Sequence, residues 1–380
     1  MTRMIWVTLA CMVGSLLPVA ASAQATPEAS PVASAAGWHV TEQVDLEVDG
    51  QPVALSPDGR WIAGTGPEGV GVCVWDVASL TPTCVGDDLR PDPFSMIWAP
   101  DSSAIAFTDG FFTEMEPNAL WLYSVDATAL TELAGNVADS PEPVIHRAPA
   151  WTPDSQSIVF MAPINDGLIA TVWMVDRSGG PLEQIPVPAV NLQGPLIPTA
   201  DGHLLFTIGG SAYAGIWQIG LDGDGFGQVV SGADLDLPVP IQIATLSTDG
   251  RYLTLWSIGQ FLEDDTIAWY VLDLETDDYV PIAASDRALV VAGPVLFSDD
   301  GLDAVVVAHD EAAGASYLHA MSLQTGEAIP IDGGEFQLGG SYWFLSRGAG
   351  GQLLIAAEGG GVLVTLEPAT GARLPLEASS

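Results

Sequence analysis

The chain has 380 residues, with nine arginines, no lysine, 48 acidic residues and a formal net charge of −39. Such a negative field repels nucleic acids and anionic membrane surfaces, so we expect neither as a partner. Hydrophobic residues nevertheless make up 48% of the sequence. This content excludes a disordered acidic tail and indicates a large core beneath an acidic surface.

The N-terminus is typical of a cleavable secretory signal. Arg3 precedes an apolar stretch, Met4–Val19, and Ala21–Ala23 has the small-residue pattern of a cleavage site. Residues 1–23 are therefore expected to be a signal peptide. The alternatives are an uncleaved anchor, for which the apolar stretch is short, and a lipoprotein modified at Cys11, for which the preceding apolar region is shorter still.

Residues 24–37 are rich in Ala, Pro and Ser and have no hydrophobic periodicity, which indicates a flexible linker. The folded domain is expected to occupy residues 38–380. No later segment is apolar for long enough to cross a membrane. We therefore expect a secreted or cell-envelope (periplasmic) protein, monomeric and without membrane insertion after signal cleavage.

One short turn, of the Pro-Asp-Gly kind, recurs along the chain between β-rich runs. The copies are Ser56–Arg60, Ala99–Ser103, Thr152–Gln156, Thr199–His203, Ser247–Arg251 and Ser298–Leu302, with a degenerate seventh at Ala349–Gln352. The Asp residues of the six clear copies are 43, 53, 47, 48 and 51 residues apart. A period near 40–50 residues with strand-like content is typical of propeller blades.

Each turn lies between two strand-like runs, and a third and a fourth run follow it, such as Leu120–Asp126 and Leu130–Leu133. The sequence thus predicts an all-β fold, a single β-propeller with seven four-stranded blades, although six or eight blades stay open. Tryptophans recur in the third runs and are expected to pack between neighbouring blades. Ring closure has two solutions, because Trp38–Val48 can add to the last blade or replace its outer strand, Arg373–Leu376.

The motif at Ser56–Arg60, Ser-Pro-Asp-Gly-Arg followed by a β-run, resembles the TolB-type, WD-like propeller repeat. The resemblance covers about residues 51–376 and implies an exported β-propeller. The protein that gives this repeat its name resembles a small α/β domain followed by six blades. Here there is no room for such a domain before residue 38, and seven blades are predicted, so the family's partner-binding role does not carry over.

Cys73 and Cys84 remain after signal cleavage, on the third and fourth strands of the first blade. A hairpin turn around Ala78-Ser79 places the two residues nearly opposite each other. We expect a structural disulfide in an oxidising compartment, the alternative being two unpaired buried thiols.

The segment Asp222–Gly227 resembles the start of a calcium loop. Phe226 occupies the third ligand position and Ala233 the twelfth, so a hairpin turn explains the segment better, and Asp222 and Asp224 are only weak metal candidates. The five histidines form no closely spaced pair, and no zinc site is written in the sequence. We expect no cofactor, with calcium as the one alternative.

Catalytic motifs are equally scarce, because no G-x-S-x-G nucleophile motif occurs and the paired acids are expected to lie in solvated loops. The stronger signal is loop length. In a propeller the connections from second to third strand and from one blade to the next share one face, and here these are the long ones. Binding residues concentrate on long loops held by a rigid scaffold.

The candidate ligand-binding residues are aromatic and charged residues of those long connections. They are Arg90, Phe111, Phe112, Glu114, Arg147, Tyr213, Phe261, Asp264, Arg287 and Asp310. The three arginines form a positive feature for an anionic group or, as the simpler interpretation, neutralise neighbouring acids. The sequence favours a non-enzymatic scaffold that binds a protein, peptide or glycan. The alternative is a lyase, lactonase or glycosidase with a divalent cation in the central funnel.

Overall fold

A computed structural model describes residues 38–110, 119–135, 147–164, 169–190, 192–209, 214–235, 241–258, 267–284, 290–298, 303–310, 315–323, 325–336, 343–357 and 360–368. The chain divides into two units, Met1–Ser34 and Ala35–Ser380, and every described residue belongs to the second. The expected signal peptide, residues 1–23, and linker, residues 24–37, lie outside the described residues. Among the residues that the structure describes, no helix has the length and apolar character needed to cross a membrane.

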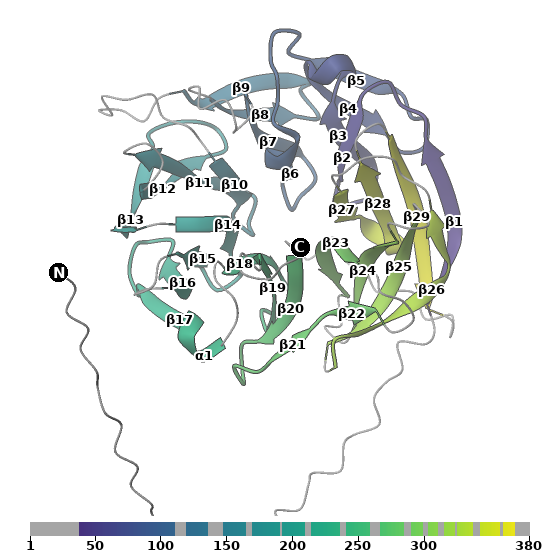
Figure 1. The fold of residues 1–380 in the computed structure, drawn as a ribbon. Helices are drawn as coiled ribbons and strands as arrows, with labels where there is room; N and C mark the ends of the chain where they lie inside the picture. The colour runs from purple at the N-terminus through teal and green to yellow at the C-terminus, as the bar shows by residue number, and fades with distance from the viewer. Residues whose placement is uncertain are drawn as a thin grey trace, which may run out of the picture. The chain divides into compact units, whose positions relative to one another are not determined.

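The second unit is a β-propeller, as the repeat predicted. Its described strands form seven four-stranded antiparallel blades around a ring, and in each blade the first strand of the repeat is innermost (Figure 1). We name the strands of a blade a to d from the inside outwards. The predicted Asp turns join strand a to strand b, although residues 299–302 of the sixth copy lie outside the described residues.

The blades follow one another in chain order. Blade 1 consists of β2 (Gln51–Leu55), β3 (Trp61–Thr65), β4 (Val72–Asp76) and β5 (Pro82–Val85). Blade 2 consists of β6 (Ile97–Trp98), β7 (Ala104–Thr108), β8 (Leu120–Ser124) and β9 (Ala129–Ala134). Blade 3 consists of β10 (Arg147–Trp151), β11 (Ser157–Ile164), β12 (Ile169–Asp176) and β13 (Glu183–Val190). Blade 4 consists of β14 (Leu192–Pro198), β15 (His203–Ile208), β16 (Gly215–Gly220) and β17 (Gly227–Ser231).

The remaining strands complete the ring. Blade 5 is β18 (Ile241–Leu246), β19 (Tyr252–Ile258), β20 (Ile267–Asp273) and β21 (Tyr279–Pro281). Blade 6 is β23 (Val290–Phe297), β24 (Asp303–Asp310), β25 (Ala315–Ser322) and β26 (Glu327–Phe336), with β22 (Ala283–Ala284) paired to β26. Blade 7 is β27 (Trp343–Arg347), β28 (Gln352–Ala357), β29 (Gly360–Pro368) and β1 (Trp38–Leu46).

Ring closure uses the N-terminal strand. β1 pairs antiparallel with β29 from Trp38 opposite Pro368 to Leu46 opposite Gly361, so β1 replaces the outer strand of blade 7. A single parallel pair, His39 with Asp332, also joins β1 to β26, which merges blades 6 and 7 into one nine-stranded sheet. The run expected as an alternative outer strand, residues 373–376, lies outside the described residues.

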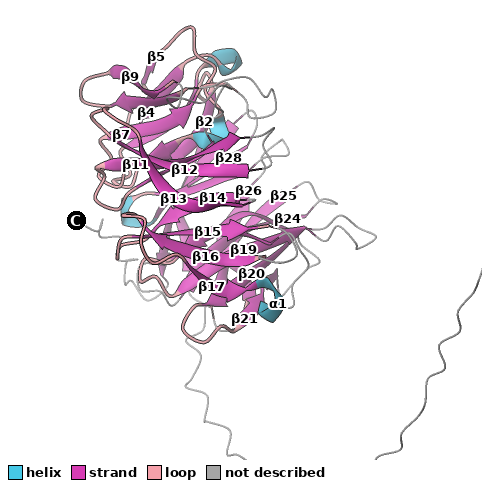
Figure 2. Cartoon of the chain, turned by 90° about the vertical axis from the view of Figure 1, so that its left-hand side faces the viewer, coloured by secondary structure: helices cyan, strands magenta, loops and turns pink. Residues whose placement is uncertain are grey.

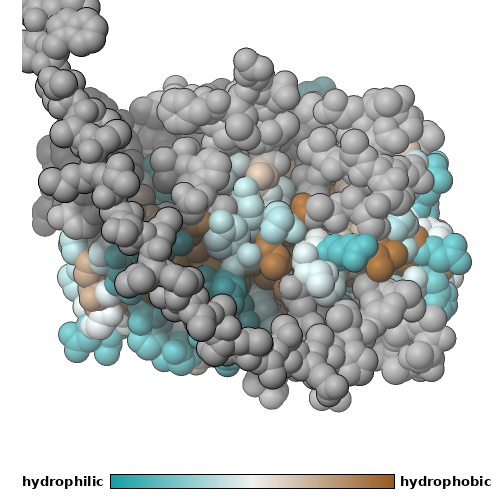
Figure 3. All heavy atoms as spheres, turned by 60° about the horizontal axis from the view of Figure 1, so that its bottom comes forward, coloured by the Kyte–Doolittle hydropathy of each residue, from teal (hydrophilic) through white to brown (hydrophobic). Residues whose placement is uncertain are grey.

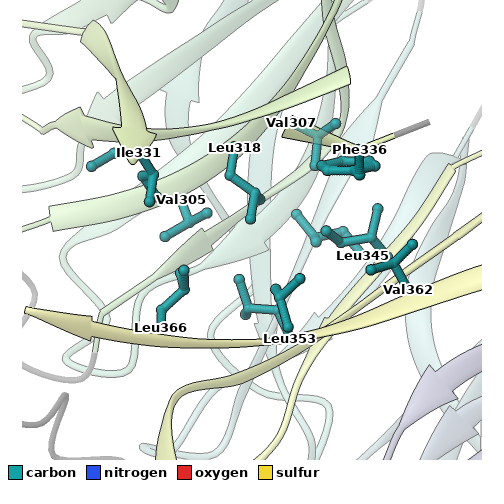
Figure 4. Packing of buried hydrophobic residues seen from close by; sticks show 12 residues of the cluster. Val305, Val307, Leu318, Ile331, Phe336, Leu345, Leu353, Val362 and Leu366 are labelled. Atoms are coloured by element: carbon teal, nitrogen blue, oxygen red, sulfur yellow. The ribbon is translucent and has the colours of Figure 1, made fainter. Parts of the chain in front are cut away.

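The core lies between the blades, where the faces of neighbouring sheets meet. All five residues of β7 are buried, whereas β5 is mostly exposed, because a strand b is covered on both faces and a strand d lies at the outside. Between blades 6 and 7, Val305 and Leu318 face Leu353 and Val362 across a continuous apolar layer (Figure 4). A fully buried side chain of this size contributes about 2 kcal/mol.

The recurrent tryptophans of the third strands contribute to this packing, as predicted. Trp75 is 1% exposed and lies in the cluster that joins blade 1 to blade 7. Trp121, Trp173 and Trp269 pack against clusters shared with a neighbouring blade. The repeat therefore keeps an aromatic at this position to fill the space between sheets.

Candidate functional site

The two faces of the ring differ in their connections. The a–b and c–d connections are short turns on one face, which we call the turn face, and the b–c and d–a connections share the other, the long-loop face. In Figure 2 described turns line the left edge of the strands, while α1 (Gly232–Leu235), part of a d–a connection, lies at the opposite edge. The expected sorting of long and short connections is thus present.

Three of the predicted candidate residues lie in described strands or loops of the long-loop face. Arg90 is exposed in the d–a connection between blades 1 and 2. Arg147, expected in a loop, is instead the first residue of β10, opposite Met161, and Asp310 is the last residue of β24, opposite Ala315. The remaining candidates lie outside the described residues: Phe111, Phe112, Glu114, Tyr213, Phe261, Asp264 and Arg287.

The connection from residue 86 to residue 95 is held rigidly on the scaffold. The backbone N–H of Arg90 donates to the Asp109 carboxylate at 2.8 Å, and the Arg90 carbonyl accepts from Gly110. The Asp92 N–H donates to the carbonyl oxygen of Thr108, the last residue of β7, at 2.9 Å. These bonds tie the backbone of the connection to the end of blade 2.

Phe94 is the most exposed large hydrophobic residue within the described part of the chain, at 58%. It belongs to a short helical turn, η2 (Pro93–Ser95), whose first N–H groups are capped by the Asp92 carboxylate, which accepts from the Phe94 N–H at 3.0 Å. The Phe94 ring centroid lies 5.1 Å from that of Phe344 on β27. The aromatic pair therefore lies beside the innermost strand of blade 7.

Asp92 is 7% exposed, and its environment changes its acidity. Burial raises the pKa of the Asp92 carboxyl above its ordinary value, and the hydrogen bond from the Phe94 N–H only partly opposes this shift. Sequence reasoning missed both Phe94 and Asp92. The Asp-Pro dipeptide, an N-cap followed by proline, was a usable signal for a helical turn at this place.

The weak metal candidates lie on the other face. Asp222 and Asp224 belong to the c–d turn between β16 and β17, and the Asp222 carboxylate accepts the Asp224 N–H at 3.0 Å. Phe226, which occupied a ligand position in the calcium comparison, stacks on Trp217 with a centroid distance of 4.9 Å. No group of three or more metal-ligating side chains occurs among the described residues.

The expected disulfide is present. Cys73 on β4 and Cys84 on β5 are directly opposite each other in the hairpin, with a Cα–Cα distance of 4.1 Å, and are bonded. The Cys73 side chain is fully buried in the cluster between blades 1 and 7. The bond is therefore structural, and it is compatible with an oxidising compartment.

The sequence matches no family model and no curated protein. Solved structures do match in fold. TolB from Acinetobacter baumannii is 16% identical, with a TM-score of 0.48, and the alignment covers 74% of this chain and 66% of TolB. The chain therefore spans just under two thirds of the length of that protein.

Two further solved structures cover more of both chains. An oligogalacturonate lyase from Vibrio parahaemolyticus has a TM-score of 0.60 and 12% identity, covering 87% of this chain and 92% of the lyase. An oligogalacturonate lyase in complex with manganese has a TM-score of 0.55 and 14% identity, covering 83% and 90%. At such identities these likenesses show the β-propeller fold alone.

Proposed function

We propose that this chain is an exported, non-enzymatic β-propeller that binds a protein, peptide or glycan through its long-loop face. The exposed Phe94, fixed beside Phe344 on a hydrogen-bonded connection, carries this proposal. Exposed aromatic side chains on rigid supports are typical of binding hot spots, and they also stack on sugar rings. Arg90, an exposed residue on the same connection, adds a guanidinium donor for carboxylates or carbonyl groups.

Export is supported by two independent features. The first 23 residues have the pattern of a cleavable signal, and the bonded pair Cys73–Cys84 is of the kind that persists in oxidising compartments. N-terminal sequencing of the protein recovered from its native host tests this part. The expected first residue is Gln24.

Binding is tested with the mature protein on immobilised glycan and random-peptide arrays. We expect a defined set of ligands whose affinity falls at least about fivefold in Phe94→Ser, as for an interface residue worth more than about 1 kcal/mol. Arg90→Ala is expected to act in the same direction. The matched control is Phe226→Ser, which removes a partly exposed aromatic from the turn face, 37% exposed. Ligands that bind equally well to all three variants would place recognition elsewhere.

The alternative function is a propeller enzyme with a divalent cation, and its one specific support is the fold-level likeness to oligogalacturonate lyases over most of both chains. The test is incubation of the mature protein with oligogalacturonate, with and without Mn²⁺, followed by ultraviolet absorbance of the unsaturated uronate product. Metal-dependent product formation would contradict the non-enzymatic proposal.

A further inference from the structure

Two neighbouring interfaces of the ring are filled by a tryptophan that precedes the a–b turn. Trp98 of blade 2 donates its indole N–H to the carbonyl oxygen of Ala54 in blade 1 at 3.0 Å. Trp151 of blade 3 donates in the same way to Ile97 in blade 2 at 3.3 Å. The indole group of each tryptophan thus packs against the preceding blade and occupies the space near the turn face.

A second position of the same turn adds a link between blades. Ser102 accepts the backbone N–H of Asp58 at 3.0 Å, and Ser155 accepts that of Asp101 at 3.1 Å. In blades 4 and 5 this position is Gly202 and Gly250, and a Cβ added to either would meet nothing within 4 Å. At these two positions the turn therefore makes no side-chain link to a neighbouring blade.

The residue that precedes the a–b turn also differs: it is Pro198 in blade 4 and Leu246 in blade 5, where blades 2 and 3 have tryptophan. Leu246 does not fill the space between blades 4 and 5 (β14–β17 and β18–β21 in Figure 1), and a cavity of about 730 Å³ opens there on the turn face. Its volume lies within the roughly 300–1,000 Å³ typical of small-molecule sites.

The cavity has an apolar wall. The hydrophobic cluster between blades 4 and 5 ends in four half-buried residues, Ile197, Val229, Leu246 and Leu274, and all four line the cavity. Each of these side chains keeps part of its apolar surface in contact with the cavity. A ligand with an apolar body would remove their surface from water, which favours binding.

The rim of the cavity is polar and carries negative charge. Asp201 and Asp249 lie on it, from the turns of blades 4 and 5, and none of its described lining residues is Arg or Lys. The Asp201 side chain is 72% exposed, and its Oδ2 lies 3.1 Å from Nδ1 of His203. The hydrogen bond from the Thr199 hydroxyl holds the pKa of the Asp201 carboxyl below its ordinary value, which keeps it ionised.

We propose that this cavity binds a small organic cation, an ammonium group attached to an apolar body. The apolar body lies against Leu246 and its neighbours, and the ammonium group pairs with the carboxylates of Asp201 and Asp249 at the rim. The net charge of −39 raises the local concentration of such cations. This site is on the face opposite to the proposed hot spot at Phe94, and it is independent of the function proposed for that face.

The probe for this proposal is 4-phenylbutylammonium, with two matched compounds of the same body, neutral 4-phenylbutanol and anionic 4-phenylbutanoate. Calorimetric titration of the mature protein at low salt is expected to show saturable binding of the ammonium compound. The alcohol is expected to bind at least about tenfold more weakly, and the carboxylate not at all. Equal binding of all three, or no binding of the ammonium compound at about 1 mM, would overturn the proposal.

Leu246→Trp closes the cavity with the residue that blades 2 and 3 carry at the same position. It is expected to retain the fold and to weaken the ammonium compound at least about tenfold. Asp201→Asn, which keeps the oxygen that accepts from Thr199, is expected to weaken binding about three- to tenfold even if the tryptophan variant fails to fold. The matched control is Asp58→Asn, the same turn position in blade 1. Binding unchanged in Asp201→Asn, or reduced as much in Asp58→Asn, would refute the assignment.

Discussion

At the scale of single residues, the a–b turns show why serine replaces glycine in two blades. Ser102 and Ser155 both have φ of 61°, in the left-handed region that favours glycine, whereas Gly59 occupies the same position in blade 1 with φ of 73°. Both serines are nearly fully buried and accept a backbone N–H from the preceding blade. The hydrogen bond between blades therefore offsets the strained backbone.

Substitutions at Ser102 separate these two effects. Ser102→Ala keeps the strain and loses the acceptor for the Asp58 N–H, so we expect a loss of about 1–3 kcal/mol in the free energy of unfolding. Ser102→Gly also loses the acceptor but relieves the strain of a positive φ. We therefore expect Ser102→Gly to be about 1 kcal/mol less destabilising than Ser102→Ala. The measurement is urea unfolding of both variants. Gly202→Ala, where a Cβ meets nothing, reports the strain alone. Equal stability of the two Ser102 variants would show that strain is unimportant here.

The pKa of Asp92 is shifted in the opposite direction to that of Asp154 in the turn of blade 3. Burial raises the pKa of Asp92 in the folded state, so folding favours the protonated carboxyl. The resulting stabilisation is fully present below the pKa of the unfolded chain, near 3.8, and is lost as the pH rises through the pKa of the folded protein. Asp92→Asn keeps the cap oxygen for Phe94 and removes the charge. We therefore expect its stability relative to the native protein to increase from pH 3 to pH 7.

Asp154→Asn is the matched control for that pH series. The hydroxyl of Thr152 and the backbone N–H of Gln156 lower the pKa of the Asp154 carboxyl, so this group stabilises the fold above its unfolded pKa and ceases to do so as pH falls. Its substitution should lower stability more at pH 7 than at pH 3. Parallel pH trends in the two variants would contradict both assignments.

Sequence reasoning at this scale succeeded where contacts are local. Cys73 and Cys84 were paired because a hairpin turn lies midway between them, and the third-strand tryptophans were placed because they recur with the repeat. The link from Ser102 to Asp58 depends on how two blades meet in the ring, which no spacing along the chain encodes. Phe94 was missed because single exposed aromatics carry no periodic signal.

At the scale of elements, the hairpin β4–β5 of blade 1 pairs a buried strand with an exposed one and links them by a disulfide. β5 is mostly exposed, so little apolar burial holds it, and the disulfide anchors it to the buried β4. Cross-linking a loop of this length, with a sequence separation of 11, stabilises a fold by about 3 kcal/mol in the chain-entropy description.

The double variant Cys73→Ala/Cys84→Ala is expected to lose about 2–3 kcal/mol in urea unfolding monitored by circular dichroism. Adding a reductant should lower the stability of the native protein by a similar amount and leave the variant unchanged. A reductant effect of equal size on both proteins would mean that the bond does not contribute.

The turns made the strands predictable, since each Asp turn marks the end of one strand and the start of the next. Alternation of polar and apolar residues was a weaker signal, because inner strands such as β7 are buried on both faces. The closing strand was left open between Trp38–Val48 and the C-terminal run, because both have the same strand-like composition. Only the pairing of β1 with β29 decides between them.

At the scale of the whole molecule, the charge of −39 on one chain opposes the compact state. The described surface presented in Figure 3 is largely hydrophilic, with small separate hydrophobic areas. Charges within about 10 Å of one another interact through solvent at 0.1 M salt, and less at higher salt. The unfolded chain spreads the same charge over a larger volume.

We therefore expect the melting temperature to rise by about 2–4 °C between roughly 0.02 M and 0.5 M NaCl, equivalent to about 1 kcal/mol. Potassium chloride at the same ionic strength should have the same effect, because screening does not depend on the identity of the cation. A rise with CaCl₂ well beyond that of matched ionic strength would instead indicate specific calcium binding.

The fold was readable from the sequence because a sevenfold repeat gives many observations of one pattern. The site was not, because binding residues lie in the irregular connections, where each loop occurs once and its neighbours come from other blades. The cavity between blades 4 and 5 illustrates this limit. Leu246 is an ordinary strand residue in the sequence, and only comparison with Trp98 in the assembled ring shows the space that it leaves.

The pairing of β1 with β29 also sets an order for folding. β1 is among the first strands to be synthesised, and its partner is the last described strand of the chain, so the two ends of a long loop must meet before the ring closes. Until then the outer edge of β29 lacks a neighbour and is exposed to pairing with other chains. The ring can therefore close only after Gly360–Pro368 has been synthesised. We expect chains that end before β29 to aggregate rather than form smaller rings.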